Sequence, residues 1–333
     1  MKRPLRARPL PRGAALLAAM LTVTLVATFA AAAMWQQWRG IEVETAERAR
    51  VQSAWILIGA LDWSRLILYE DAPVSDHLAE PWAVPLAEAR LSTFLAAQDG
   101  AAQEDASTDT QDAFLSGQIV DLQSRLNVAS LVKSGAVQQG AHDQFSRLFT
   151  QLGLPQSQLT ALEQALLRAA AAELAEGSDA ALMPQHVEQL GWLGLPPASL
   201  AALSPFVTVL PEPTPVNVNT ASPEVLLAAI DGLDRAGAET LANARETVPF
   251  RALTDVSTLL GRSNPLPPEE LSVGSSYFEV GGRLRLGDAV VQERSLVHRI
   301  GKQVKAVWRT RSASAMESAL PSANPTMARN IRP

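Results

Sequence analysis

RGAALLAAMLTVTLVATFAAAAMWQQW, residues 12–38, is the stretch that decides the fold of this chain. A helix rises about 1.5 Å per residue and a bilayer core is about 30 Å thick, so about 20 apolar residues cross it. Residues 14–38 are long enough and carry no charge. Five basic residues precede them: Lys2, Arg3, Arg6, Arg8 and Arg12. Positive residues favour the cytoplasmic side and indoles the interface, so we expect a single span with Trp35 and Trp38 at its outer end.

Three interpretations of this segment compete. It could be a secretory signal peptide cut after Ala31-Ala32-Ala33, but the apolar run is longer than the roughly 7–15 residues of such a core. It could be a single-span anchor that is never processed. It could also be cut at its cytoplasmic end, after Gly13, so that the apolar helix becomes the N-terminus of the mature protein. The position of Gly13 favours the third, because a small residue leaves the backbone open to a peptidase where the charged leader meets the apolar helix.

The string Arg12-Gly13-Ala14-Ala15-Leu16-Leu17 resembles the cleavage region of type IV pilins and type II secretion pseudopilins. The resemblance implies cleavage by a prepilin peptidase between Gly13 and Ala14, followed by N-methylation of Ala14. It also implies that the apolar helix stays in the membrane, with side chains such as Leu16, Leu17, Leu21, Leu25, Phe29 and Trp35 facing lipid or neighbouring helices.

Position five of the mature chain would be Ala18, where this superfamily nearly always has Glu. That Glu is thought to pair with the N-terminal ammonium of a neighbouring subunit, and an unpaired carboxylate is costly in hydrocarbon. A subunit at the tip of a filament has no earlier subunit to offer that ammonium. The K-type minor pseudopilin of type II secretion is the member known to lack this Glu, so Ala18 favours that type.

The next segment, residues 39–68, has the period of an amphipathic helix, with apolar positions at Val51, Ala54, Trp55, Ile58, Leu61, Leu66 and Ile67. We expect it to be a stalk that packs on a globular head. Residues 71–85 and 98–111 are expected to be loops, and Ile119–Leu122 a strand. A block from about 138 to 272 is rich in Ala and Leu and is expected to be helical. Leu152-Gly153-Leu154-Pro155 and Leu193-Gly194-Leu195-Pro196 interrupt it and hint at a degenerate repeat.

Three segments near the C-terminus favour an antiparallel meander: Tyr277–Leu286, Ala289–Ile300 and Val304–Thr310, with turns at Gly287-Asp288 and Gly301-Lys302. Strands rarely stand alone, so we expect the strand near residue 119 to join this meander in one sheet. The predicted fold is α+β: a long N-terminal membrane and stalk helix on a small antiparallel, pilin-like sheet, with a large all-α insertion between strands.

The predicted organisation follows from these segments. It comprises a leader (1–13), a membrane helix (14–38), a stalk (39–68), the first part of the head (69–136), a helical insertion (137–273), the closing meander (274–311) and a disordered tail (312–333).

Residues 215–245 resemble a helix-hairpin-helix, the DNA-binding element that also occurs in membrane-anchored DNA uptake receptors. Ser222-Pro223 is a helix start, and Gly232 stands in the turn. The second glycine of the motif is replaced by Asp234, and Asp231 precedes Gly232, so two carboxylates would repel phosphate. A DNA receptor therefore stays the alternative function. The string from Val216 to Ser222, with Asn217 and Asn219, also resembles one in the insertion of K-type pseudopilins.

Composition excludes several other classes. The chain has a net charge of −6, which becomes −11 without the five leader cations, so a nucleic-acid partner is not expected. It has no cysteine, and its four histidines (His77, His142, His186 and His298) show no metal-ligand spacing. No motif of an enzyme is present, so no catalytic residue and no required cofactor are predicted.

Calcium is bound by some pseudopilins, and K-type insertions often carry a dense acidic run. Here residues 162–185 contain only Glu163, Glu173, Glu176 and Asp179, so a family calcium site is doubtful, although the acidic loop 99–112 could contribute oxygen ligands.

The K-type resemblance covers the leader, the stalk, Ile119–Leu131, the Asn217 string and the closing strands. It implies a minor pseudopilin at the tip of the pseudopilus, which starts assembly and helps to export folded proteins across the outer membrane. Its implied partners are the I- and J-type minor pseudopilins, the major pseudopilin, the inner-membrane platform and the outer-membrane channel. The implied location is the inner membrane, with a cytoplasmic N-terminus and a periplasmic head.

Replacement of Gly13 by leucine should block processing, because a bulky side chain obstructs the backbone at the cleavage point. The uncleaved precursor should accumulate and secretion should stop, as seen by gel mobility and by assay of an exported protein. Gly40→Leu, in the same helix but away from the cleavage point, is the control. Normal processing of the Gly13 variant would contradict the leader interpretation.

Overall fold

A computed structural model of the chain describes residues 12–71, 75–92, 113–172, 182–286 and 289–314. The predictions for leader residues 1–11, the loop 98–111, Glu173, Glu176, Asp179 and tail residues 315–333 lie outside these ranges. Contacts divide the chain into two units, residues 1–56 and 57–333. The first described element, α1 (Arg12–Glu70), belongs to both units.

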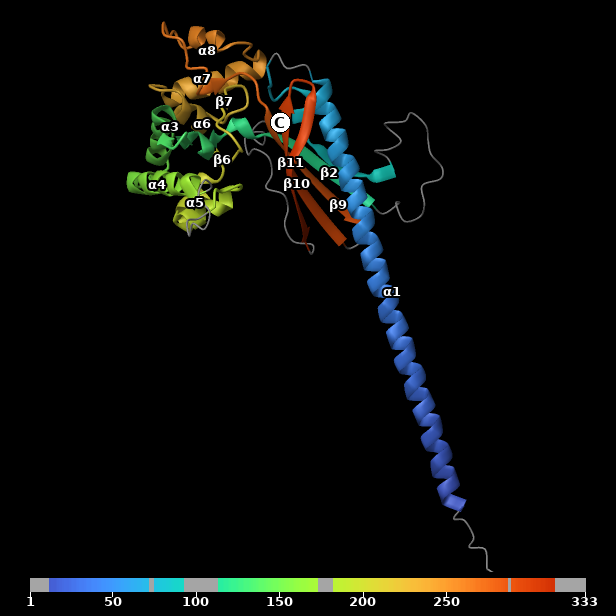
Figure 1. Cartoon of the computed structure of the whole chain (residues 1–333). Coiled ribbons are helices and arrows are strands. Elements are labelled where there is room, and N and C mark those ends of the chain that lie inside the picture. Colours follow the sequence, from blue (N-terminus) through green and yellow to red (C-terminus); the bar gives the residue numbers. More distant parts are fainter. Residues whose placement is uncertain (1–11, 72–74, 93–112, 173–181, 287–288, 315–333) are drawn as a thin grey trace, which may run out of the picture. The chain divides into compact units, whose positions relative to one another are not determined.

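The second unit contains a five-stranded sheet with the order β1-β2-β9-β10-β11 (Figure 1). All four pairings are antiparallel. Its strands are β1 (Leu86–Arg90), β2 (Ala113–Asp121), β9 (Tyr277–Leu286), β10 (Ala289–Ile300) and β11 (Gln303–Ser314). The expected meander is confirmed as β9, β10 and β11, and β2 joins it beside β9. The helical block is therefore inserted between two neighbouring strands, as predicted.

Two details of the sheet differ from the sequence-based expectation. β1 was not predicted, because its alternation over LAEAR is short and Pro85 precedes it. β11 continues to Ser314, so residues 312–314, which were assigned to the tail, are strand. Their register against Val290, Val291 and Gln292 explains the extension, because the longer β10 supplies partners for them.

The last turns of α1 pack on one face of the sheet. Leu57, Leu61, Ser64 and Leu68 are buried at spacings of four, three and four residues, which is one face of a helix. Leu61 and Leu68 form a core with Trp82, Ile119, Phe278, Val280, Val297 and Val304. The expected packing face was partly wrong, because Val51, Trp55 and Leu66 are more than half exposed. The helix has apolar residues on a buried face and on an exposed face, and the sequence pattern does not distinguish the two.

A second core belongs to the helical domain, which Figure 1 shows beside one end of the sheet. Its described helices are α3 (Gln139–Gln151), α4 (Gln156–Ala172), α5 (Pro197–Leu203), α6 (Pro223–Ala229), α7 (Arg235–Thr247) and α8 (Leu253–Leu259). Short 3₁₀ helices accompany the helices and strands: η1 (Pro81–Ala83), η3 (Leu122–Ser124), η4 (Val128–Leu131) and η5 (Val187–Leu193).

The block is less purely helical than expected. It also contains the parallel pairs β3–β6 (Leu126–Asn127 with Val207–Thr208) and β7–β8 (Val216–Asn217 with Leu271–Ser272). The hairpin β4–β5 (Val132–Lys133 with Ala136–Val137) precedes α3.

The two Leu-Gly-Leu-Pro strings adopt the same structure. Gly153 and Gly194 have φ angles of 67° and 89°, the left-handed conformation that favours glycine at a helix C-terminus. In each, the following leucine donates its backbone N–H five residues back: Leu154 to Phe149 at 2.8 Å and Leu195 to Leu190 at 3.3 Å. The repeat hinted at by the sequence is thus a repeated helix stop followed by a proline-started helix.

Leu61→Ala should lower the free energy of unfolding of the head by about 2–5 kcal/mol, because it empties a site in the core under α1. Leu66→Ala, on the exposed stripe of the same helix, is the matched control and should change it by less than about 0.5 kcal/mol. Denaturant unfolding of a version that begins at Arg39 measures both. Equal losses would contradict the packing face given above.

Candidate functional site

The membrane helix displays an apolar surface along its first turns. α1 begins at Arg12, so Gly13, Ala14 and Ala18 all lie in helical backbone. It is the one helix among the described residues that is long and apolar enough to cross a membrane, judged by length and composition. The predicted membrane-facing side chains are all at least half exposed: Leu16, Leu17, Leu21, Leu25, Phe29 and Trp35.

Three threonines of this span donate hydrogen bonds from their hydroxyls to their own helix. Thr22, Thr24 and Thr28 donate to the carbonyl oxygens of Ala19, Met20 and Leu25 at 2.8, 3.0 and 2.9 Å. Such bonds spare a hydroxyl the cost of standing unpaired in lipid. Residues 14–38, Ala18 included, carry no charged side chain.

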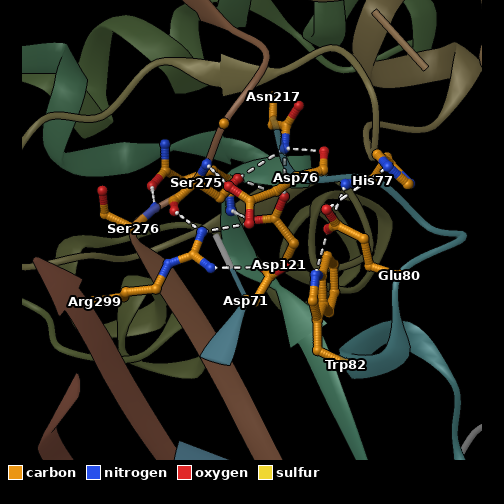
Figure 2. Close-up of polar contacts among 12 residues, drawn as sticks. Asp71, Asp76, His77, Glu80, Trp82, Asp121, Asn217, Ser275, Ser276 and Arg299 are labelled. Carbon is orange, nitrogen blue, oxygen red and sulfur yellow. Dashed lines mark hydrogen bonds and ion pairs between the residues drawn. The ribbon is translucent and has the colours of Figure 1, made fainter. Parts of the chain in front are cut away.

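A buried polar cluster lies where the sheet meets the helical domain. We call it the junction and define it as Asp76, Asp121, Asn217, Ser275 and Arg299 (Figure 2). All five are less than 9 % exposed. They come from the loop before β1, the end of β2, β7, the loop before β9 and the end of β10.

Asp121 is the centre of the junction. It ends β2 and is 2 % exposed. Its Oδ2 accepts hydrogen bonds from Thr220 Oγ1 at 2.5 Å, Ser275 Oγ at 2.6 Å and Asn217 Nδ2 at 3.1 Å. Its Oδ1 accepts from the backbone N–H of Gln123 at 2.8 Å, which caps η3. One carboxylate of the sheet therefore binds two segments that are about a hundred residues or more away in sequence.

The two asparagines singled out in the sequence, Asn217 and Asn219, are structural. Asn217 Nδ2 also donates to the Asp76 carbonyl at 3.1 Å and to Ser275 Oγ at 2.9 Å. Its Oδ1 accepts from the backbone N–H of Asn219. The side chain of Asn219 in turn bonds both the N–H and the C=O of Phe250. These bonds clamp the Val216–Ser222 string between the sheet and the helical domain, and neither side chain is free to bind a ligand.

Arg299 supplies the positive charge of the junction. Its guanidinium pairs with the carboxylates of Asp76 and Asp71, the latter at 2.9 Å, and donates to the Ser275 carbonyl at 2.9 Å. Its side chain is 2 % exposed and lies over the Phe278 ring, 4.9 Å from the centroid. Asp76 also accepts from the Ser275 N–H at 2.6 Å. Burial is expensive for a single charge but tolerable for a charge held by two partners.

Burial raises the pKa values of the carboxyl groups in this region. The pKa of Asp121 rises to about 6, although the bonds from Ser275, Thr220 and Gln123 oppose the rise. The pKa of Asp76 is raised too, because desolvation outweighs the opposing effect of Arg299. Burial also raises the pKa of Glu80. Because all three pKa values are raised, the three groups change the free energy of unfolding in the same direction as the pH changes.

One group of three carboxylates among the described residues has the spacing of a metal site: Asp71, Asp76 and Glu80, whose oxygens lie within 4.8 Å of one another. Donor groups of the protein already bind these carboxylates. Arg299 binds both aspartates, and Glu80 Oε2 accepts from Trp82 Nε1 at 2.6 Å and from the His77 N–H at 2.9 Å. These contacts describe an ion-pair cluster and do not fit the open oxygen cage that calcium requires.

The hairpin seen in the sequence exists as α6, a turn and α7. Ser222 caps α6 by accepting from the Val225 N–H at 3.3 Å, and Gly232 has the left-handed φ of 63°. Asp234 caps α7, with Oδ1 accepting from the Gly237 N–H at 2.7 Å. A helix start that binds phosphate in a DNA-binding hairpin is thus occupied here by the carboxylate of the chain itself. The exposed Asp231 beside it is a second carboxylate, which pairs with Arg147 at 3.3 Å.

The sequence pattern singled out Asn217 and Asn219 but did not identify Asp76, Asp121, Ser275 and Arg299. Asp121 had one signal, a carboxylate directly after the apolar residues Ile119 and Val120. Its burial could not be seen, because the residues that cover it are distant in sequence. Gly13, Ala14 and Ala18 lie apart from the junction in the sequence, and the structure brings Ser222 and Gly232 together only as parts of the hairpin.

The free energy of unfolding of the head should fall as the pH rises from about 4 to 7. A carboxyl whose pKa is raised on folding stabilises the fold fully below its ordinary pKa, and this contribution is lost as the pH rises through the folded value, about 6 for Asp121. The loss from Asp121 should be about 3 kcal/mol at 1.36 kcal/mol per pKa unit. Denaturant unfolding of the version that begins at Arg39 measures it.

Asp121→Asn should remove the part of this pH dependence that Asp121 contributes, whereas Asp143→Asn, which changes an exposed carboxylate on α3, should leave that part intact. An unchanged slope in the Asp121 variant would show that this group does not titrate on unfolding.

Comparison with known proteins gives two matches to family models, both described as type II secretion system protein K. They cover residues 124–212 and 216–274, which is the helical domain with the hairpin. A type II secretion system protein K of Pseudomonas aeruginosa is 29 % identical over 309 residues, which are 83 % of this chain and 85 % of that protein. One of Klebsiella pneumoniae is 26 % identical over 334 residues, covering 90 % and 95 %.

A solved structure has a similar fold. It is the GspK-GspI-GspJ complex from the type 2 secretion system of enterotoxigenic Escherichia coli, in which one chain matches with a TM-score of 0.58 and 16 % identity. The match covers 81 % of this chain and 99 % of that chain. Both relatives and both family models are described as type II secretion system protein K, so this chain is similar to that family along most of its length.

Proposed function

We propose that this protein is the tip subunit of the type II secretion pseudopilus, where it starts assembly and helps to export folded proteins across the outer membrane. The observation that carries the proposal is the uncharged position five, Ala18, at the start of a fully apolar helix. A shaft subunit needs a carboxylate there to meet the ammonium of its neighbour. A tip subunit would bury that carboxylate in the membrane without a partner, which is unfavourable in hydrocarbon.

The helical domain supports the same position. It is a large addition to the pilin-like sheet, and it is fixed to the sheet by buried hydrogen bonds from Asn217 and Thr220 to Asp121. A bulky, firmly attached domain is acceptable on the last subunit but would clash with a subunit stacked above it. The protein would then end the filament.

The life cycle proposed here starts with cleavage after Gly13 by a prepilin peptidase and N-methylation of Ala14. The protein is a single-pass inner-membrane protein, and we place its N-terminus in the cytoplasm and its head in the periplasm. Its proposed partners are the I- and J-type minor pseudopilins, the major pseudopilin, the inner-membrane platform and the outer-membrane channel. The GspK of the solved complex assembles with GspI and GspJ, which supports the first two.

The role proposed is one of assembly, with no catalysis and no required cofactor. Calcium is not part of the proposal, because the acidic cluster at Asp71 is held by Arg299 and Trp82. A DNA receptor is not supported either, because Asp234 occupies the helix start that would hold phosphate and the family matches cover the hairpin.

Ala18→Glu should leave folding of the head unchanged but reduce the number of filaments that start, because the tip would carry an unpaired carboxylate in the membrane. Counting pseudopili on cells that overproduce the major pseudopilin, together with secretion assays, measures this. Ala18→Leu, which keeps the position apolar, is the matched control and should behave as wild type. Equal filament numbers in both variants would remove the physical basis of the tip assignment.

A further inference from the structure

A cavity of about 230 Å³ lies in the head between α1 and the sheet. Its floor includes two glycines, Gly117 of β2 and Gly282 of β9, which stand directly opposite each other in the register. Neither has a side chain, and Leu57 of α1 packs against Gly282, which leaves the sheet uncovered over Gly117. Leu57 and Leu61 of α1 form part of the roof, and Trp82 closes one side. The lining is mostly apolar, so the cavity can hold an apolar group.

The next row of the sheet places a polar group in the cavity wall. Ser295 of β10 lines the cavity and is 1 % exposed, yet its Oγ has no hydrogen-bond partner among the described residues. A buried hydroxyl without a partner costs about 1–3 kcal/mol, so such groups are rare and usually meet a ligand or water. Ser295 is an interior position at which a bound molecule would complete the hydrogen bonding.

Positive charge lies beside Ser295. Glu293 also lines the cavity and is 4 % exposed. It pairs with Arg309 through Nε at 3.1 Å and with Arg311 through Nη2 at 2.6 Å. Two guanidiniums on one carboxylate leave one positive charge in excess, although Glu293, and neither arginine, lines the cavity. Arg309 stands directly opposite Ser295 in the register, and directly opposite residues point to the same face of a sheet.

We propose that this cavity binds a small molecule or chain end with an apolar body and a single carboxylate. The body would lie over Gly117 under α1, and the carboxylate would accept from Ser295 Oγ and approach Arg309. The excess positive charge would repel a ligand with a cationic end. A ligand with an uncharged end would gain no electrostatic attraction from it. A cavity of about 150 Å³ holds benzene, so one of this size has room for a phenyl ring with a short chain.

The proposal is tested with 4-phenylbutyrate, which is soluble and has this chemistry. Its affinity for the full-length protein in lipid nanodiscs is measured by ligand-observed NMR, with empty nanodiscs as the blank. 4-Phenylbutanol and 4-phenylbutylamine share its body and differ in the end group. We expect the carboxylate to bind most tightly, the alcohol less tightly and the amine least tightly. No binding of 4-phenylbutyrate above the blank, or tighter binding of the amine, would overturn the proposal.

Variants separate the two parts of the site. Arg309→Gln should weaken 4-phenylbutyrate about tenfold or more, as for the loss of a charge-assisted hydrogen bond, and leave 4-phenylbutanol unchanged. Arg294→Gln, which removes a charge from the neighbouring position on β10 and hence the other face of the sheet, is the matched control and should change neither. Equal effects of the two variants would overturn the role of Arg309.

If Arg309→Gln fails to fold, Ser295→Ala serves in its place, because that hydroxyl makes no hydrogen bond whose loss would destabilise the protein. This variant should bind 4-phenylbutyrate several-fold more weakly. Unchanged affinity would show that Ser295 is not part of the site.

A free fatty acid and the C-terminus of a protein both offer an apolar body with a carboxylate. Displacement of 4-phenylbutyrate by octanoate would assign the ligand to fatty acids, and displacement by N-acetylphenylalanine would assign it to protein C-termini. Displacement by neither would count against the site. The cavity lies wholly within the head, so these results do not depend on the tip role, which rests on the membrane helix.

Discussion

The carboxylate of Asp121 is the interaction on which the head depends, because it joins a sheet and a helical domain that have separate hydrophobic cores. Four donors reach it: a backbone N–H, an amide and two hydroxyls. Apolar packing is non-directional and would leave the angle between two domains loosely defined. Hydrogen bonds have direction, so a buried, fully bonded carboxylate fixes that angle. Arg299 and Asp76 extend the same network to the end of β10 and the loop before β1.

A fixed angle matters for a subunit that ends a filament. The helical domain can exclude a further subunit only if it stays in place, and the junction holds it by bonds at Asn217, Thr220 and Ser275. The cost is a buried carboxylate with a raised pKa, which makes the head less stable at neutral than at acid pH. The membrane helix differs from the junction in this respect: it has the uncharged Ala18 at a position where a carboxylate would find no partner.

Much of the fold could be predicted from the sequence, because its strongest patterns are local. The bounds of β9 and β10 follow from turn residues and alternation, and the membrane helix follows from an uncharged run. The packing face of α1 could not be fixed in the same way, since Leu57 and Trp55 are equally apolar and only the sheet decides which is buried. Asp121, Asp76 and Arg299 could not be identified for a similar reason, because their partners are up to 228 residues away in sequence. The cavity depends on Gly117 standing opposite Gly282, a register that no sequence pattern reveals.

N-terminal mass spectrometry of the protein extracted from membranes tests the pseudopilin assignment most directly. Every step proposed for it, from processing to the tip of the filament, requires that the apolar helix survive as the mature N-terminus. The result predicted is a first peptide that begins at Ala14 and carries an N-methyl group. A mature chain that begins near Met34 would contradict it, because the membrane helix, Ala18 included, would have been removed with a signal peptide.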